Sequence, residues 1–363
     1  GGVRIAVVGD LGQTRDSVAT ISEVAASAPD FMVLVGDLSY ADGNGTRWDR
    51  WGRLMDPWLS ELPLVTFPGN HEIEMDAATG ETFKHFRSRF RAPESEPEVT
   101  GPGTVLDPDV HGDYAFDFTY EYGASYFSLD VGAAHLVCLN TYVRSKPGSA
   151  QFEWFASDLA QMDRQKTPWL LVFAHAPLYS SNQAHQAEAA TLAMRQAIEP
   201  LLHRYRAAAF LSGHVHAYER THPAYEGRRD DEAGTVYVTI GDGGNREGLK
   251  DKWLGGDEDD DEGGGGGGGR EPDTGLGFDG GASAAGSAEV TAAEKTPDWV
   301  AFRDGAHFGR GDLLVSNATH LRWQWWPNSA LEAQDETWIV NPYFRAGGGG
   351  GGSEGDGGGG GGG

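Results

Sequence analysis

Hydrophobic positions along the chain gather into short apolar runs, most of which end at a glycine or a polar turn. Such runs predict buried β-strands, and the longer amphipathic segments between them predict helices. We expect strands at 3–8, 31–35, 64–67, 114–118, 125–130, 134–140, 169–174, 207–211 and 236–240. We expect helices at 15–27, 47–58, 149–164 and 185–203.

The order of these elements indicates the fold class. Strands alternate with helices over residues 3–67, which favours βαβ units around a sheet buried on both faces. Residues 312–316 and 319–326 form a further pair of strands, and we expect this pair to join 236–240 in closing a second sheet. The sequence therefore predicts an α/β fold.

Two segments have a different composition. Residues 255–290 are acidic, rich in glycine and poor in apolar side chains, and 346–363 are almost entirely glycine. Neither can bury enough apolar surface to offset the entropy lost on ordering. We expect one folded domain over 1–345, interrupted by a disordered insert at 255–290 and followed by a glycine-rich tail.

Charge restricts the partners. The 363 residues include 54 Asp and Glu against 28 Lys and Arg, which gives a formal net charge of −26. Such a chain should repel nucleic acid and anionic membranes, and any anionic substrate would need strong local cations such as metal ions. One cysteine, Cys138, excludes an internal disulfide and thiolate zinc sites.

The apolar runs of the chain fall short of the roughly 20 residues that span a bilayer, so no membrane insertion is expected.

The start of the chain suggests that processing has occurred. Residue 1 is glycine, not methionine, and an apolar strand follows at once, so we expect a processed form or an excised fragment. Asn44-Gly45-Thr46 and Asn317-Ala318-Thr319 match the acceptor pattern for N-glycosylation. Such triplets also arise by chance, so by themselves they do not decide whether the protein is a secreted or lumenal glycoprotein.

Five short motifs share one feature, because each follows a predicted buried strand. Loops at the carboxyl ends of strands converge in α/β proteins, and ligands collect there. The motifs are Gly9-Asp10-Leu11-Gly12, Gly36-Asp37-Leu38-Ser39-Tyr40, Gly69-Asn70-His71-Glu72, Ala174-His175-Ala176-Pro177 and Gly213-His214-Val215-His216.

The residue types in these motifs suit metal ions. Carboxylate and amide oxygens are hard ligands, and imidazoles are borderline ones. A carboxylate such as that of Asp37 has two oxygens and can bridge two metals, while a phenolate at Tyr40 would favour a hard trivalent ion such as Fe(III). A single Gly-Asp pair or His-x-His is more often a turn or a surface feature. Five such motifs in this order indicate a binuclear metal site.

At these residues the chain resembles the metallophosphoesterase superfamily and, within it, the purple acid phosphatases. The family pattern of GDxG, GDxxY, GNHE, a histidine after an apolar strand and GHxH is matched in full. The segments 239–245 and 301–311 also resemble the closing part of the large plant and fungal members. The resemblance implies a four-layer α/β/β/α sandwich, with two mixed β-sheets flanked by helices.

The resemblance also implies a ligand set. It assigns Asp10, Tyr40 and His216 to Fe(III), and Asn70, His175 and His214 to a divalent ion that is Fe, Zn or Mn. Asp37 would bridge the two. His71 matches a position that contacts phosphate and the leaving group, and His185 would be a second such residue, so that substrate binding falls to Asn70, His71 and His185.

The chain departs from the family in its loop after His175. Many large members have adjacent histidines there, whereas this chain has Ala184 before His185, and Leu178 stands where a tryptophan is common. Both differences bear on substrate preference. The large members also carry an N-terminal β-sandwich, so we expect this chain to be their catalytic domain.

These features predict an acid phosphatase that hydrolyses small phosphate monoesters by attack of a metal-bound hydroxide. One alternative is a phosphodiesterase or phosphoprotein phosphatase of the same superfamily. Those enzymes usually have a histidine two residues after the first aspartate, where this chain has Gly12. A second alternative is a metal-holding storage or wall protein without useful turnover. The oligomeric state and the natural substrate stay open.

Overall fold

The computed structural model describes residues 2–74, 82–91, 125–186, 188–255 and 295–345. The expected strand at 114–118, nearly all of the expected insert at 255–290 and the glycine-rich tail lie outside these residues.

One mixed sheet contains six strands in the order β15-β14-β13-β1-β2-β3. Within this sheet the adjacent strands β1, β2 and β3 run parallel, and the pairs β1–β13, β13–β14 and β14–β15 are antiparallel. The bounds are β1 (Val3–Val8), β2 (Phe31–Leu34), β3 (Leu64–Thr66), β13 (Gly309–Val315), β14 (His320–Pro327) and β15 (Asp335–Val340).

A second mixed sheet contains seven strands in the order β12-β8-β11-β7-β6-β5-β4, and β5, β6, β7 and β11 run parallel. Its strands are β4 (Phe127–Val131), β5 (Ala134–Cys138), β6 (Trp169–Phe173), β7 (Ala209–Ser212), β8 (Tyr218–Thr221), β11 (Val236–Ile240) and β12 (Val300–Asp304). A small hairpin pairs β9 (Ala224–Tyr225) with β10 (Arg228–Arg229).

Helices begin where the local sequence offers a cap. Thr14 accepts hydrogen bonds from the backbone at the start of α1, and Asn44 and Ser149 do the same for α2 and α5. The helices are α1 (Arg15–Ala26), α2 (Gly45–Leu59), α3 (Lys84–Arg89), α5 (Ala150–Gln161), α6 (Ala189–Arg204) and α7 (Pro342–Arg345), with a 3₁₀ turn η1 (Asn70–Glu72).

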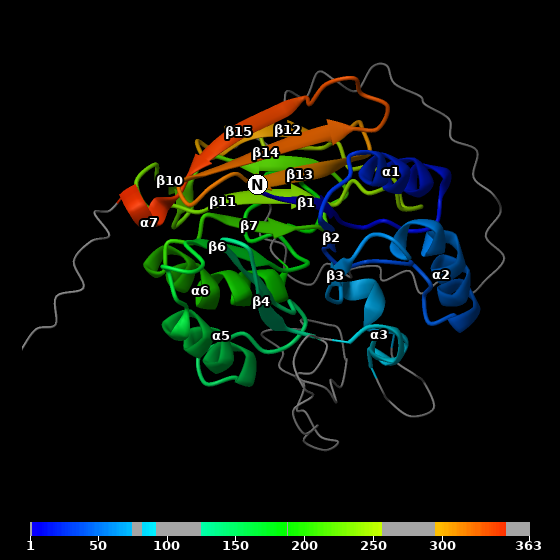
Figure 1. Cartoon of the computed structure of the whole chain (residues 1–363), viewed down its shortest axis with the longest axis horizontal. Coiled ribbons are helices and arrows are strands. Elements are labelled where there is room, and N and C mark those ends of the chain that lie inside the picture. Colours follow the sequence, from blue (N-terminus) through cyan, green and yellow to red (C-terminus); the bar gives the residue numbers. More distant parts are fainter. Residues whose placement is uncertain (1, 75–81, 92–124, 187, 256–294, 346–363) are drawn as a thin grey trace, which may run out of the picture.

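Four layers follow from the alternation of side chains along the central strands. In β1, Ile5 and Val7 enter the core between the two sheets, while Ala6 and Val8 face the core under α1 and α2. The second sheet packs its other face under α5 and α6. Strands buried on both faces read as continuous apolar runs, which explains why the sequence pattern identified them. The predicted α/β/β/α sandwich is confirmed (Figure 1).

Two expectations about the elements were wrong. The strands predicted at 312–316 and 319–326 belong to the first sheet, where Val315 of β13 lies opposite Val3 of β1. Alternating apolar residues fit the inner face of either sheet, so their pattern does not choose the partner. The helix expected from residue 185 begins at Ala189, because the backbone of His185 is left-handed, with φ of 58°.

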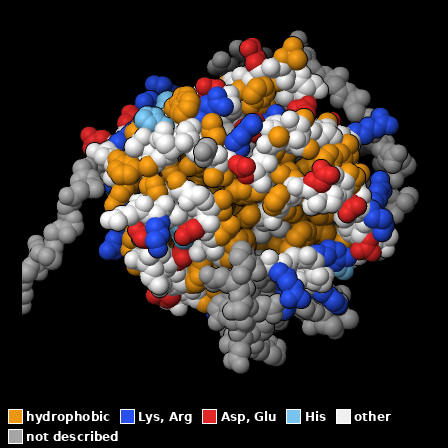
Figure 2. Space-filling view, viewed as in Figure 1, with side chains coloured by type: hydrophobic (Ala, Val, Ile, Leu, Met, Phe, Trp, Pro, Cys, Tyr) orange, Lys and Arg blue, Asp and Glu red, His pale blue; other side chains and the backbone are white. Residues whose placement is uncertain are grey.

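The surface of the described part mixes charge types. On the face in Figure 2, Lys and Arg side chains are interspersed with Asp and Glu among apolar patches. Among the described helices, none combines the length and the apolar character needed to cross a bilayer.

Candidate metal centre

Strand ends from both sheets meet at one place. Asp10 follows β1, Asp37 and Tyr40 follow β2, and Asn70 begins η1 after β3. From the second sheet, His175 follows β6, and His214 and His216 follow β7. The parallel strands of each sheet end on the same side, so the two sheets bring these side chains together.

Glycines allow the loops to approach the carboxylates. A Cβ atom added to Gly69 would lie 2.1 Å from Oδ1 of Asp37, and one added to Gly213 would lie 2.2 Å from Oδ2 of Asp10. Any other residue at these positions would displace a carboxylate of the site.

The backbone at the site is unusual. Asp10, Asp37, Tyr40 and His214 all have left-handed conformations, with φ of 55°, 51°, 51° and 68°. Residues other than glycine rarely adopt this conformation, and it costs of order 1–3 kcal/mol per residue where it occurs. The surrounding fold therefore holds four side chains of the centre in place against a local backbone preference.

One group of polar atoms surrounds the Tyr40 hydroxyl. That oxygen lies 3.1 Å from Oδ1 of Asp10, 3.0 Å from Nε2 of His216 and 3.5 Å from Oδ2 of Asp37. Nε2 of His216 is also 3.4 Å from Oδ1 of Asp10. Tyr40 is 1% exposed, and the two aspartates are equally buried.

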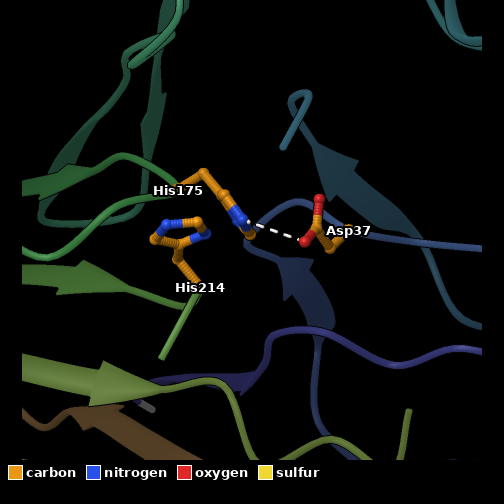
Figure 3. A group of neighbouring side chains, drawn as sticks. All are labelled: Asp37, His175 and His214. Atoms are coloured by element: carbon orange, nitrogen blue, oxygen red, sulfur yellow. Dashed lines mark ion pairs between the residues drawn. The ribbon is translucent and has the colours of Figure 1, made fainter. Parts of the chain in front are cut away.

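A second group surrounds the amide oxygen of Asn70. Oδ1 lies 3.0 Å from Nε2 of His175 and 2.9 Å from Nδ1 of His214. Nε2 of His175 is 3.2 Å from Oδ2 of Asp37, the contact drawn in Figure 3. The Asp37, His175 and His214 ligand atoms lie within 4.8 Å of one another. Asp37 thus belongs to both groups.

The outer nitrogens of the histidines fix their tautomers. Nδ1 of His175 donates to the carbonyl of Val35 at 2.8 Å, and Nδ1 of His216 faces the carbonyl of Gly248 at 3.2 Å. Nε2 of His214 lies 2.9 Å from a carboxylate oxygen of Glu188. A neutral imidazole that donates from one nitrogen presents a lone pair on the other, and this arrangement typically orients a metal ligand.

The donor set fits metal ions. When both imidazoles are neutral, the atoms that converge in the second group are two imidazole lone pairs, an amide oxygen and a carboxylate oxygen, all of them acceptors. Ligand atoms about 2.0–2.2 Å from a metal ion lie about 3 Å apart when they subtend a right angle at it, which matches these separations. A cation among them would satisfy all four.

Buried charge shapes the pKa values around Asp37. Burial alone would raise the pKa of Asp37, but the cationic His175 and His71 lower it below its usual range. Burial would lower the pKa of His175, yet Asp37 and Asp10 raise it to about 10. Burial and the neighbouring Asp10 raise the pKa of Tyr40 well above 10. In the metal-free protein His175 is therefore protonated. The carboxylates of Asp37 and Asp10 that balance this charge would also balance the charge of a bound cation.

His71 lies beside the centre, outside both groups of ligand atoms. Its ring centroid is 4.2 Å from that of Tyr40. Nδ1 is 3.4 Å from Asp42 and Nε2 is 3.4 Å from Glu247. Burial would lower the pKa of His71, but the charge of Asp37 and the contact with Asp42 raise it to about 9. His71 can therefore present a positive charge to an anion.

His185 lies beside His214, on the loop before α6. Its ring centroid is 4.1 Å from that of His214. Nδ1 lies 2.7 Å from Glu188, whose second oxygen contacts His214. One carboxylate thus holds both imidazoles, and Nε2 of His185 is the ring nitrogen left for a ligand.

The structure brings together all nine residues singled out from the sequence, and three more that sequence reasoning missed. The buried carboxylate of Glu72 accepts hydrogen bonds from the backbone N–H groups of Asp37, Leu38 and Gly69, and so ties two of the loops together. Glu188 and Tyr142 also reach the site. Glu72 stands inside the GNHE motif and could have been noticed, whereas Glu188 and Tyr142 stand in segments without a motif.

Comparisons with known proteins agree with this geometry. The calcineurin-like phosphoesterase family matches residues 3–218, and the family described as iron/zinc purple acid phosphatase-like protein C matches 279–336. Purple acid phosphatase 22 of Arabidopsis thaliana is 40% identical over 341 residues, and probable purple acid phosphatase 20 of the same plant is 33% identical over 342. Each alignment covers 93% of this chain, but only 63% and 65% of those proteins.

A solved structure shares the fold. Purple acid phosphatase PPD1 from yellow lupin (Lupinus luteus) seeds aligns with a TM-score of 0.67 at 22% identity, over 95% of this chain and 55% of that one. Two sheets whose strand ends meet at paired groups of potential metal-ligand side chains agree with the family that matches residues 3–218. The chain belongs to the calcineurin-like phosphoesterase family. Its relatives within that family are the purple acid phosphatases, and it spans just under two thirds of their length.

Proposed function

We propose that this protein is an acid phosphatase that hydrolyses small phosphate monoesters with a pair of metal ions. The observation that carries the proposal is the pair of converging groups of ligand atoms that share Asp37. A carboxylate placed between two such groups is what a binuclear centre requires. The relatives named as purple acid phosphatases support the same activity.

In this proposal Fe(III) would be held by Asp10, Tyr40 and His216, because a phenolate suits a hard trivalent ion. The divalent ion, Fe, Zn or Mn, would be held by Asn70, His175 and His214. Asp37, which belongs to both groups of ligand atoms, would be a ligand of both ions. The separation of the two groups around the shared carboxylate supports this division.

Bound metal ions would supply charge neutralisation for the phosphoryl group and an acidified water as the nucleophile. The chain itself binds and orients the substrate. His71, held between Asp42 and Glu247, would bind a phosphate oxygen, and His185, held by Glu188, would act on the leaving group. Either imidazolium can protonate a departing alkoxide, which is worth about 10²–10⁴-fold in rate.

The phosphodiesterase and phosphoprotein phosphatase alternative is less well supported. Gly12 occupies the position where those enzymes usually carry a histidine, and its φ is 72°. A Cβ at this position would lie 2.9 Å from Cα of Asn245, so a histidine would need a different backbone. The space near Asp10 is filled instead by Asn245, which donates to the carbonyl of Asp10 at 3.2 Å.

A secreted or lumenal location fits the acid chemistry, and Asn44 and Asn317 are both exposed, as N-glycosylation requires. The proposed partners are small phosphate esters and not nucleic acid, in keeping with the net charge of −26.

Metal analysis combined with turnover tests this proposal. The protein should hold two metal ions per chain, one of them iron, and should hydrolyse an aryl phosphate monoester faster than the corresponding diester. Asp37→Ala should lose this activity and weaken both ions, whereas Asp56→Ala, which removes an exposed carboxylate of α2, should change neither. Two tightly bound ions with no turnover would favour the metal-holding alternative, and preference for the diester would favour the phosphodiesterase.

A further inference from the structure

A strand that carries none of the five motifs also sends a side chain to the metal centre. β5 lies beside β6 and parallel to it, so the loop after β5 emerges next to His175. Tyr142 stands in this loop, four positions after the last residue of the strand. Its side chain is 7% exposed, and it packs with Ile73 and Phe83 in a small apolar cluster of its own.

This loop is held by a closed set of hydrogen bonds. The N–H of Tyr142 donates to Oδ1 of Asn140 at 2.8 Å, and the N–H of Asn140 donates to Oε1 of Gln151 at 2.7 Å. The side-chain amide of Gln151, itself 1% exposed, donates back to the carbonyl of Asn140 and to Ser145. The loop is therefore fixed on α5, and the position of the phenol does not depend on a ligand.

A second tie connects the loop to the metal centre. The N–H of Ala176, the residue after His175, donates to the hydroxyl of Thr141 at 3.1 Å. The rings of Tyr142 and His175 have centroids 6.1 Å apart. The loop after β5 is thus hydrogen-bonded directly to the segment that carries His175.

The Tyr142 hydroxyl points to a proposed ligand. It lies 3.3 Å from Oδ1 of Asn70, the same atom that faces His175 and His214. The carboxylates of Asp37 and Glu188 are near enough to act on the phenol electrostatically. Their negative charge favours the orientation in which the O–H dipole points into the centre, so the hydroxyl acts there as a donor.

An asparagine ligand needs such a neighbour. The two ends of its amide have nearly the same shape, but only the oxygen can bind a cation, while the NH₂ group can donate to an imidazole lone pair. In a metal-free centre the lone pair on Nδ1 of His214, whose Nε2 faces Glu188, would draw the NH₂ end inward. The Tyr142 hydroxyl opposes this rotation of the Asn70 amide, because the hydroxyl donates to an acceptor only while Oδ1 stays in place.

We propose that Tyr142 is a positioning residue that holds the amide oxygen of Asn70 toward the divalent metal ion. The inference rests on the proposed function only in that Asn70 is taken as a ligand of that ion. Partners that orient metal ligands commonly contribute about 10–100-fold to metal affinity. The effect should be largest for the divalent ion, because the hydroxyl of Tyr142 contacts Asn70 and its ring lies beside His175, both of them proposed ligands of that ion.

Zn²⁺ competition against a chelator tests the inference on the iron-loaded protein. Tyr142→Phe should bind Zn²⁺ about 10–100-fold more weakly while its iron content and visible absorption stay unchanged. Tyr225→Phe is the matched control. Tyr225 lies on the hairpin strand β9, and its ring stacks on that of His203. Unchanged Zn²⁺ affinity in Tyr142→Phe would overturn the inference, whereas a wild-type protein that binds no second ion would overturn the proposed function.

A double-mutant cycle separates orientation from other effects. In Asn70→Asp the ligand is a carboxylate, which offers an oxygen whichever way it is turned. Tyr142→Phe should therefore cost little Zn²⁺ affinity in the Asn70→Asp protein. An equal cost in both backgrounds would refute the orienting role. Weaker competitive inhibition by inorganic phosphate, with Zn²⁺ affinity intact, would also refute it and would identify Tyr142 as a substrate-binding residue.

Discussion

Two glycines provide a way to displace each carboxylate of the centre separately. A methyl group on Gly69 would lie 2.1 Å from Oδ1 of Asp37, and one on Gly213 would lie 2.2 Å from Oδ2 of Asp10. Real Cβ atoms stay at least 3.0 Å from such neighbours, so each carboxylate must move by about 1 Å. A misplacement of about 1 Å can cost about 10²-fold in rate.

The two substitutions should differ in their effect on the metal ions. Gly69→Ala displaces the proposed bridge, so it should weaken both ions and lower kcat by about 10²-fold or more. Gly213→Ala displaces only Asp10, so it should perturb the iron and its visible band while the second ion is retained. Metal content, the spectrum and aryl phosphate turnover measure these outcomes.

Gly52→Ala is the control for both variants. This glycine is exposed on α2, and a Cβ there meets nothing within 4 Å. The substitution should leave metals and turnover unchanged and raise the free energy of unfolding by up to about 1 kcal/mol, the cost of glycine within a helix. If Gly69→Ala folds with both ions and full kcat, Asp37 is not the bridge.

Further predictions concern single side chains. Tyr40→Phe should abolish a visible charge-transfer band, and a colourless but fully active wild-type protein would contradict the iron assignment. His71→Ala and His185→Ala should keep both ions but lose more kcat on an alkyl than on an aryl phosphate, because only the poor leaving group needs a proton; equal losses would mean that they bind phosphate alone. Burial would lower the pKa of His135, but its hydrogen bonds to Asp158 and Asp130, at 2.8 and 2.6 Å, raise it. The stability that this charged histidine contributes should be fully present below about pH 6.5, its unfolded pKa, and should decline as pH rises through the folded pKa. Unfolding of wild type and His135→Gln across pH measures this, and a pH-independent difference would show that folding does not change the pKa of His135.

The sequence by itself determined the strands that build the centre. Strands such as β1, β2 and β6 are buried on both faces, so continuous apolar runs identify them without knowledge of their neighbours. Each proposed ligand follows such a run within a few residues. Parallel strands end on one side of a sheet, so the proximity of these ligands could also be expected.

The tertiary structure decided the strand pairings and side-chain contacts that join residues far apart in the sequence. β13 and β14 join β1 rather than β11, and no local pattern selects between two inner faces of similar polarity. Tyr142 reaches Asn70, 72 positions away, only because β5 pairs with β6. Glu188 was expected inside a helix, but its side chain turns to His185 and His214 at the helix start. Short-range periodicity records which face of an element is buried, whereas the choice of partner is made by packing between elements far apart in the chain.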